Sequence, residues 1–305
     1  ASSKESGSPG YEWVKDAQAM YDECKTWSRK VLYDQSTYYL DPDLANVYDV
    51  YHQADGPEHI FITAMNREGT GFEGTFSQLP QLYGINPGNI LYISKNLKGT
   101  PNADGTVEVM KFFNRTTSGN VWQVFRTDVD FYKSYDKKDL RKKLLVDTIY
   151  NEDGSVRCTY KETNIDAADN LTRSFYYPFC RKYTDPESNA NRTSANLYLI
   201  RFAEVALNYA EACGPTEEGY KWINAVRARA ELGPLSNSLS IEDFREAVYQ
   251  DRTKELVFEG HQLYDLRRWN RVNASYIQTR EIQTEYAYFY PTPQREIDLN
   301  YGLDK

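Results

Sequence analysis

The sequence predicts a mainly α-helical protein, in which a tetratricopeptide-type scaffold of right-angled helices supports a loop-rich, irregular subdomain containing a few short strands. Three observations predict this fold. Apolar residues recur at helical spacing near the N-terminus and again over residues 197–271. In the second region very short turns join consecutive helices, which is the pattern of α-hairpin repeats. Between the two regions, short apolar runs alternate with Gly, Pro and Asn turns.

The first helix follows a leader rich in Ser and Gly, and we expect it between Tyr11 and about Tyr33, within a scaffold segment at 11–35. Apolar positions spaced alternately by four and three residues share one face of an α-helix. That face should pack against the protein. It carries Trp13, Ala17, Met20, Cys24, Trp27 and Val31.

Residues 36–196 are the predicted loop-rich subdomain, which we expect to carry the ligand surface. The apolar runs His59–Met65 and Ile90–Ile93 have the length of short strands. Glycine after Asn, Asp or Pro favours tight turns between such strands. The predicted turns are Asn86-Pro-Gly88, Asp104-Gly105 and Asp153-Gly154.

Four helices are predicted over 197–271. The first begins near Asn196 and stops at Gly214-Pro215, and the second begins at Thr216, a favourable N-cap residue. The second ends at Gly233-Pro234. Their apolar stripes are Leu199, Phe202, Ala203, Ala206, Tyr209, Ala210 and Cys213 in the first, and Tyr220, Ile223, Val226 and Ala230 in the second.

The third helix follows Ser240, which with Asp243 forms a variant of the capping box, and it should end at Gly260. The fourth spans His261–Arg271. An extended tail is expected at 272–305, and residues 1–305 are interpreted as a single domain. The stripe of the third helix is Phe244, Ala247, Val248, Leu256 and Phe258.

Composition excludes several classes of function. The 305 residues include 36 Lys and Arg against 44 Asp and Glu, a net charge of −8 that repels nucleic acid and anionic membrane surfaces. There is no apolar run near the roughly 18 residues that span a bilayer. The 26 Tyr exceed the 13 Phe twofold, and Tyr rings, apolar on the face and polar at the tip, suit wet binding surfaces.

The sequence contains no catalytic or metal-binding motif that holds up in context. Gly69–Gly74 matches the dinucleotide fingerprint, but Pro80 follows where a helix should run, so a loop is predicted. The four Cys and three His lack zinc spacing, and nothing selects among three possible disulfide pairings, so buried thiols are expected. The sequence has no Gly-x-Ser-x-Gly nucleophile elbow, no His-Glu-x-x-His zinc motif and no Walker phosphate-binding loop. We therefore expect no catalytic residue, no metal and no cofactor.

Ordered charges in the last helices allow two interpretations. Anion binding is one. Arg–carboxylate pairs that tie helix ends together are the other, and the equal supply of acids favours these structural pairs. The residues concerned are Arg227, Arg229, Arg252, Glu255, Glu259, Asp265, Arg267 and Arg268.

Four stretches stand out in order: LIRFAEVALNYAEA (199–212), WINAVRARA (222–230), RTKELVFEGHQLYDLRRW (252–269) and YPTPQREIDLN (290–300). They closely resemble the SusD/RagB family of glycan-binding surface lipoproteins of Bacteroidetes. Weaker similarities are Tyr135–Arg141 and Arg181–Tyr183. Gln262 departs from the pattern, because the family usually has Arg there.

The resemblance implies a function in glycan uptake. Such a protein binds an oligosaccharide or polysaccharide at the extracellular face of the outer membrane without catalysis. It passes the glycan to a SusC-like TonB-dependent transporter. The match begins inside the family pattern, so the chain is interpreted as the C-terminal portion, and membrane attachment is expected through a lipid anchor outside it. A glycoside hydrolase on a helical scaffold and a peptide-binding repeat scaffold remain alternatives.

The ligand-binding residues are expected in two loops. Trp122 lies after a Ser-Gly-Asn turn, where family members often place an aromatic residue at the sugar site, although a Trp in such a loop can equally plug a small core. Arg126, Tyr132 and Asn120 are expected as rim contacts, with pairing of Arg126 to Asp128 or Asp130 as the structural alternative. The second choice is the glycine-rich loop with Phe72, Phe76 and Tyr83.

Overall fold

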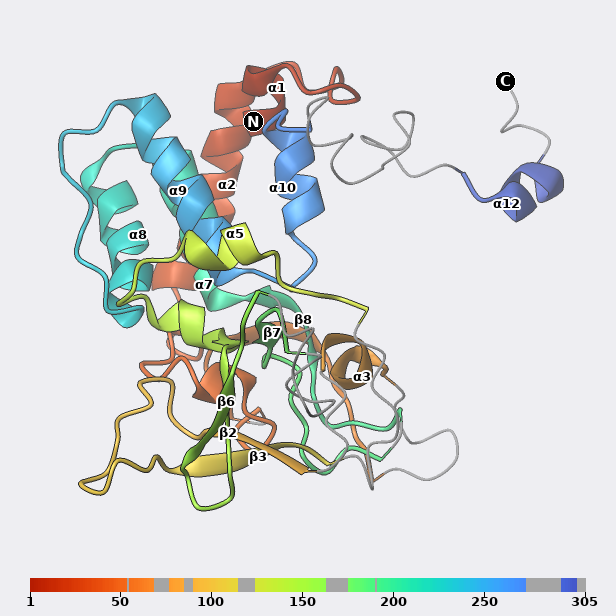
Figure 1. Cartoon of the computed structure of the whole chain (residues 1–305). Helices are drawn as coiled ribbons and strands as arrows, with labels where there is room; N and C mark the ends of the chain where they lie inside the picture. The colour runs from red at the N-terminus through yellow and green to blue at the C-terminus, as the bar shows by residue number, and fades with distance from the viewer. Residues whose placement is uncertain are drawn as a thin grey trace. The chain divides into compact units, whose positions relative to one another are not determined.

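The computed structural model describes residues 1–53, 55–68, 77–84, 90–114, 124–162, 175–189, 191–272 and 292–300 (Figure 1). The chain divides into a smaller unit, Ala1–Cys24 with Gly260–Lys305, and a larger unit, Lys25–Glu259. Each unit is described by itself. In the described part of the chain, no helix combines the length and apolar character needed to cross a bilayer.

In the smaller unit, a segment near the N-terminus packs against a segment that follows residue 260. Helix α1 (Ser2–Ser6) packs against α10 (Gln262–Arg268). The Ser6 hydroxyl donates to the carbonyl of Arg268 at 2.8 Å, and the Arg268 guanidinium donates to the Ser2 hydroxyl at 2.8 Å. The predicted fourth helix is thus present with narrower bounds. The tail predicted to be extended contains a short helix, α12 (Gln294–Leu299), which begins directly after Pro293.

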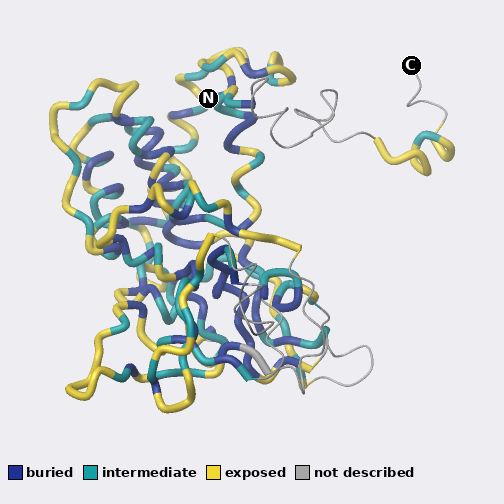
Figure 2. Tube along the Cα trace, in the orientation of Figure 1, coloured by how far each residue is buried: buried dark blue, intermediate teal, exposed yellow. Residues whose placement is uncertain are grey.

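Three helices form the main core of the larger unit: α7 (Phe202–Cys213), α8 (Glu217–Arg229) and α9 (Ile241–Glu255). Helix α7 packs against both others. The caps are those predicted, since the Thr216 hydroxyl accepts from the amide of Gly219 and the Ser240 hydroxyl accepts from the amide of Asp243 at 3.0 Å. Buried residues follow these helices in Figure 2. They include Phe202, Ala206, Tyr209, Ile223, Val226, Phe244 and Val248.

Gly219 explains why the turn between α7 and α8 is so tight. A Cβ atom at this position would lie 2.0 Å from the carbonyl oxygen of Gly214 and 3.1 Å from the Phe244 ring. Gly214 itself has φ 65°, a left-handed conformation that glycine adopts without strain. The two glycines therefore allow α7, α8 and α9 to approach closely.

Helix α9 is shorter than predicted. It ends at Glu255, with Leu256 as its C-cap, and Phe258 has φ 65°. A bulky residue in the left-handed region is uncommon, so Phe258 belongs to a turn and not to the helix. The predicted continuation to Gly260 is wrong by one turn.

The first predicted helix of the C-terminal region is corrected at its start. Residues Leu197–Arg201 form strand β8, which pairs antiparallel with β1 (His59–Thr63). Leu199 is 41% exposed and does not share the buried face of α7. Periodicity alone could not show this, because the partner strand lies more than 130 residues earlier in the chain.

The packing face of α2 (Ala17–Tyr33) is also corrected. Trp13 and Trp27, predicted to pack, are 68% and 59% exposed. Tyr21, Ser28 and Leu32 are buried instead. This stripe is one residue further along the helix, a rotation of about 100°. The hydrophobicity pattern favoured the face with the large Trp rings. That face is the wrong one, because a small polar residue such as Ser28 can be buried in its place.

The loop-rich region forms a four-stranded antiparallel sheet of order β3-β2-β5-β6. In the larger unit it lies at the end away from α7, α8 and α9 (Figure 1). Its buried side chains include Leu91, Ile93, Phe112 and Ile149. The strands are β3 (Val109–Asn114), β2 (Ile90–Ser94), β5 (Thr148–Tyr150) and β6 (Val156–Thr159).

Short elements fill the rest of this region. Strands β4 (Leu145–Val146) and β7 (Phe179–Cys180) pair with each other. Cys180 is a buried thiol, as expected, and burial raises its pKa to about 12, whereas Cys24, Cys158 and Cys213 are only partly buried. The other short elements are the 3-10 turns η1 (Asn46–Tyr48) and η3 (Leu140–Leu144) and the helices α3 (Leu79–Tyr83) and α5 (Val129–Lys133).

Two predicted turns are confirmed, at Gly105 with φ 85° and at Gly154 with φ 82°. The two turns have the same hydrogen-bond pattern. The side-chain amide of Asn102 donates to the Thr106 hydroxyl, and the side-chain amide of Asn151 donates to the Ser155 hydroxyl. The Asn86–Gly88 turn and the Gly69–Gly74 run lie outside the described residues.

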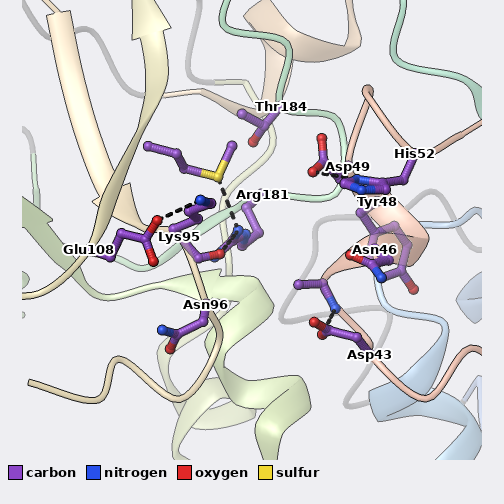
Figure 3. A pocket seen from close by; sticks show the side chains of 12 residues that line it. Asp43, Asn46, Tyr48, Asp49, His52, Lys95, Asn96, Glu108, Arg181 and Thr184 are labelled. Atoms are coloured by element: carbon purple, nitrogen blue, oxygen red, sulfur yellow. Dashed lines mark hydrogen bonds and ion pairs between the residues drawn. The ribbon is translucent and has the colours of Figure 1, made fainter.

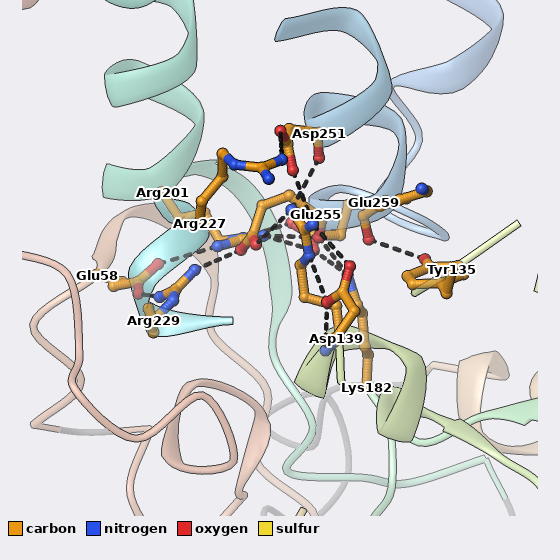
Figure 4. Close-up of polar contacts among 12 residues, drawn as sticks. Glu58, Tyr135, Asp139, Lys182, Arg201, Arg227, Arg229, Asp251, Glu255 and Glu259 are labelled. Carbon is orange, nitrogen blue, oxygen red and sulfur yellow. Dashed lines mark hydrogen bonds and ion pairs between the residues drawn. The ribbon is translucent and has the colours of Figure 1, made fainter. Parts of the chain in front are cut away.

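A buried ion-pair network joins the helices to the loop-rich region (Figure 4). At its centre, the Arg201 guanidinium contacts the carboxylates of Glu58, Glu255 and Glu259 at 2.9, 2.9 and 2.7 Å. The network has five cations and five carboxylates, so its formal charge is zero. Its members are Arg141, Lys182, Arg201, Arg227 and Arg229 with Glu58, Asp139, Asp251, Glu255 and Glu259.

This network confirms the interpretation of the helix charges as structural pairs. Arg227 and Arg229 bind Asp251 and Glu255, while Arg252 binds Glu204 outside the network. In the smaller unit, Arg268 pairs with Asp265. Burial opposes ionisation of Glu259, but Arg201 and Lys182 outweigh it and lower the pKa of this carboxyl to about 2.

Candidate functional site

An aromatic cluster surrounds Tyr83, the last residue of α3. Its ring centroid lies 5.0 Å from that of Phe125, 5.2 Å from that of Tyr183 and 5.0 Å from that of Phe258. Tyr183 is buried, whereas Phe125 is 43% exposed. The cluster therefore runs from the protein interior to an aromatic ring that solvent can reach.

Arg126 extends this cluster toward Tyr176 and Tyr177. Its guanidinium carbon lies 5.2 and 5.1 Å from the two ring centroids, and it donates a hydrogen bond to the Tyr176 hydroxyl. Such cation–π contacts hold a guanidinium flat against aromatic faces. We name the set Tyr83, Phe125, Arg126 and Tyr176 the aromatic platform.

Backbone contacts explain why residues distant in sequence meet here. The amides of Val124 and Phe125 both donate to the carbonyl of Leu82 at 3.1 Å, which fixes the segment from 124 beside α3. Pro80 stands in the first turn of α3, and the amide of Gly84 donates back to its carbonyl, so the helix is one closed turn. The platform is thus positioned by main-chain geometry.

A series of ring contacts supports the platform from below. Tyr183 stacks against Tyr83, and its ring centroid lies 6.2 Å from that of Tyr198. The ring centroids of Tyr198 and Tyr48 are 5.5 Å apart. The Tyr48 hydroxyl donates to Glu259 at 2.9 Å, which joins the series to the ion-pair network. Burial raises the pKa of Tyr83 well above its ordinary value, so its hydroxyl stays neutral. Rigid support of this kind holds binding side chains in place before a ligand arrives.

A second feature is a cavity of about 200 Å³ between η1, strands β2 and β3, and the chain after β7 (Figure 3). The Asp49 carboxylate contacts the His52 ring at 2.9 Å, and Asp43 accepts from the amide of Ala45. Six of the residues that line it are Asp43, Asn46, Asp49, His52, Arg181 and Thr184.

The chemistry of the platform suits a polyhydroxylated ligand. Ring faces of Phe125 and Tyr176 present apolar surface to the C–H face of a sugar, and Arg126 supplies oriented N–H donors. Among the described residues, no group of three or more His, Cys, Asp or Glu is placed to hold a metal ion.

The structure places the predicted ligand residues in different settings. Tyr83 contacts Phe125, and Arg126, the next residue along the chain, contacts Tyr176 and Tyr177. Tyr132 is buried, its hydroxyl donates to Asp147 at 2.6 Å, and Lys142 lies over its ring. Asp128, a suggested partner of Arg126, caps α5 by accepting from the amide of Phe131. Four further residues lie outside the described part of the chain: Phe72, Phe76, Asn120 and Trp122.

Sequence reasoning missed Phe125, Tyr176 and Tyr183. Phe125 stands next to Arg126 in the same predicted loop, and Tyr183 belongs to a short stretch already noted for its resemblance. Adjacency to those residues was the available signal. Tyr176 has no such signal, because its contact with Arg126 joins positions 50 residues apart.

Comparisons with known proteins agree on one family. The sequence model of the SusD family matches residues 57–285. SusD-like protein P2 of Formosa agariphila is 28% identical over 164 residues, which are 49% of this chain and 32% of that protein. The matched segment thus covers about a third of that relative.

Solved structures show the same fold. Surface glycan-binding protein A from Bacteroides thetaiotaomicron, in complex with laminarihexaose, is 18% identical with a TM-score of 0.65, covering 92% of this chain and 58% of that one. A SusD homologue from the same organism is 20% identical with a TM-score of 0.64, covering 93% and 58%. The family model spans three quarters of the sequence, and the chain belongs to the SusD family.

Proposed function

We propose that the protein binds an oligosaccharide or polysaccharide at the cell surface without catalysis. The aromatic platform is the observation that carries this proposal. It combines an exposed ring, a second ring and a guanidinium on a rigid, buried support. The glycan complex of the similar Bacteroides thetaiotaomicron protein supports a sugar as ligand.

We further propose that the bound glycan is delivered to a SusC-like TonB-dependent transporter for nutrient uptake. The protein would act at the extracellular face of the outer membrane, held there by a lipid anchor. Family membership supports these proposals. Neither nucleic acid nor the membrane surface itself is a proposed partner, because the net charge is −8.

The proposed architecture follows the same family logic. Helices α7, α8 and α9, joined by short capped turns, would belong to a tetratricopeptide-type scaffold formed by 11–35 and 197–271. Residues 36–196 would carry the ligand surface, with a tail at 272–305. Trp122, Asn120, Phe72 and Phe76 remain proposed ligand contacts, since their loops adjoin the platform in sequence. Tyr132 is not proposed as a ligand contact, because its side chain is buried and its hydroxyl donates to Asp147.

The test is isothermal titration against a glycan panel, with a hydrolysis assay on the same panel. We expect at least one glycan to bind and to be recovered intact. Release of reducing ends in proportion to protein concentration, lost on mutation of one carboxylate, would establish the glycoside hydrolase alternative. Binding of peptides but of no glycan would establish the peptide-binding alternative.

A further inference from the structure

Arg181 differs from the other buried cations of the larger unit. Arg141, Lys182, Arg201 and Arg252 each contact a carboxylate at 3.2 Å or less. Arg181 is also buried, adjacent to Lys182, and forms no ion pair with any described residue. Within the described part of the chain, its guanidinium donates to the carbonyls of Ser94 and Lys95, at 3.1 and 3.4 Å, and to the Met110 sulfur at 3.5 Å.

The environment of Arg181 is unfavourable for a lone cation. Burial lowers its pKa to about 10, and the nearby charges of Asp49 and Asp43 act in the opposite direction without cancelling this effect. A guanidinium has five N–H donors, and the three contacts above leave two of them unused. A buried charge without a partner is costly, so the structure favours an anionic group beside Arg181.

Thr184 is the second, independent observation. Its side chain is buried, and its hydroxyl has no hydrogen-bond partner among the described residues. The amide of Thr184 donates to the carbonyl of Arg181 at 3.1 Å, so one turn carries both side chains. Both line the same cavity (Figure 3). One turn therefore brings an unsatisfied hydroxyl and a cation without an ion pair to this cavity.

The opposite wall supplies acceptors. Asp43 accepts from the amide of Ala45 through one carboxylate oxygen, whereas Asp49 accepts from the amide of Tyr51 through one oxygen and contacts the His52 ring through the other. Both keep acceptor capacity, because a carboxylate can accept about four hydrogen bonds. These two charges repel a dianion such as phosphate or sulfate. They favour a ligand that donates hydroxyl groups. The cavity of about 200 Å³ equals the liquid volume of roughly six or seven waters, which is room for one small ring with its substituents.

We propose that this cavity binds a single sugar residue that carries a carboxylate, a uronate. Its carboxylate pairs with the Arg181 guanidinium and accepts from the Thr184 hydroxyl, in the planar geometry that arginine offers to carboxylates. Its ring hydroxyls donate to Asp43 and Asp49. The proposal rests on the proposed function in taking a sugar as ligand, but its site shares no residue with the aromatic platform.

The direct test is calorimetric titration of the chain with free galacturonate and glucuronate. Galactose and glucose are the matched neutral probes, and acetate, sulfate and phosphate are the matched anions. We expect a uronate to bind at least about tenfold more tightly than the neutral sugar of the same configuration, because the neutral sugar has no carboxylate to pair with Arg181. Equally tight binding of sulfate or phosphate would show that the cavity is a general anion site and would overturn the uronate proposal.

Two variants locate the binding. Arg181→Met should abolish uronate binding, and Thr184→Val should weaken it about tenfold while leaving the protein as stable as the parent, because the hydroxyl satisfies no partner in the free protein. Lys111→Met is the control: Lys111 is exposed on β3, next to the cavity residue Met110, and the same charge is removed. Uronate binding that survives Thr184→Val unchanged overturns the proposal even if Arg181→Met fails to fold.

Failure of this proposal is distinct from failure of the proposed function. If neutral glycans bind and lose affinity on Phe125→Ala while no uronate binds, the platform stands and the cavity proposal is overturned. If uronates bind with the predicted dependence on Thr184 but no glycan depends on Phe125, the cavity proposal stands alone.

Discussion

At the scale of single residues, exposure of one aromatic ring decides where a sugar can stack. Phe125 is exposed while its neighbours in the cluster are buried or partly buried, and Trp122 precedes it by three positions. We expect Phe125→Ala and Trp122→Ala each to weaken glycan binding by about 1–3 kcal/mol, the loss typical of an aromatic anchor. Titration with the best glycan of the panel measures this loss.

The matched control is Trp27→Ala. Trp27 is 59% exposed on α2, and the Lys30 Nζ atom lies 4.0 Å from its ring centroid. It is therefore an exposed aromatic residue outside the platform. Its removal should leave the affinity unchanged. If Trp27→Ala weakens binding as much as Phe125→Ala does, the platform is misassigned.

Gly219 gives a second prediction for a single residue. Alanine normally stabilises a helix relative to glycine by about 1 kcal/mol. At this position the added Cβ would lie 2.0 Å from a backbone oxygen, so the sign reverses and Gly219→Ala should destabilise by about 1–3 kcal/mol. Thermal unfolding measures it. Gly233→Ala is the control, since nothing lies within 4 Å of its Cβ, and a loss of stability there would refute the steric explanation.

At the scale of elements, the sequence predicted what local patterns determine. Caps at Thr216 and Ser240 and the turn at Gly154 need only neighbouring residues, and all three are present. Strand β8 and the face of α2 depend on partners far away in sequence. LYLIR reads as helix or strand until β1 pairs with it, and no single sequence pattern contains that information.

The same principle applies to the candidate site. Tyr83 and Arg126 could be selected from composition and loop position, but their environment could not. Phe125 contacts Tyr83 although the two are 42 positions apart in the sequence, and Arg181 becomes notable only when its lack of an ion pair is seen. Proximity between loops is a tertiary property, so sequence reasoning found members of the site and missed its geometry.

One element prediction separates the two interpretations of residues 197–202. Phe202 is buried in the core of α7, whereas Leu199, predicted to share its stripe, is exposed on β8. Phe202→Ala should cost about 3–5 kcal/mol, which lowers the melting temperature by roughly 2–4 °C per kcal/mol at this size. Leu199→Ala should change it little. Equal losses for the two variants would contradict the strand and restore the helical stripe.

At the scale of the whole molecule, the buried ion-pair network connects sequence to family. All of its members except Glu58 and Asp251 lie in the stretches that resemble SusD proteins. Those stretches therefore encode the junction between helices and loops, whereas the residues of the aromatic platform lie outside them. This separation accounts for a fold that is shared at 18–20% identity.

The network also predicts how stability depends on pH. The pKa of Glu259 falls from an ordinary value of 4.5 to about 2, because Arg201 and Lys182 outweigh the effect of burial, and the pKa of Glu255 is lowered in the same way by Arg229, Arg201 and Arg141. Above pH 4.5 both carboxyls are ionised in the folded and unfolded chain, so their stabilisation is complete. As pH falls toward 2, the unfolded chain binds protons first and the folded state loses stability.

We therefore expect the melting temperature to fall steeply between pH 4.5 and about 2. Because these pairs are buried, salt should screen them little, and the fall should persist when the ionic strength is raised to about 0.5 M. Calorimetric melting across this range at both ionic strengths tests the prediction. A melting temperature that stays constant to pH 2, or a dependence that salt removes, would assign acid stability to surface charges and leave the network without its predicted role.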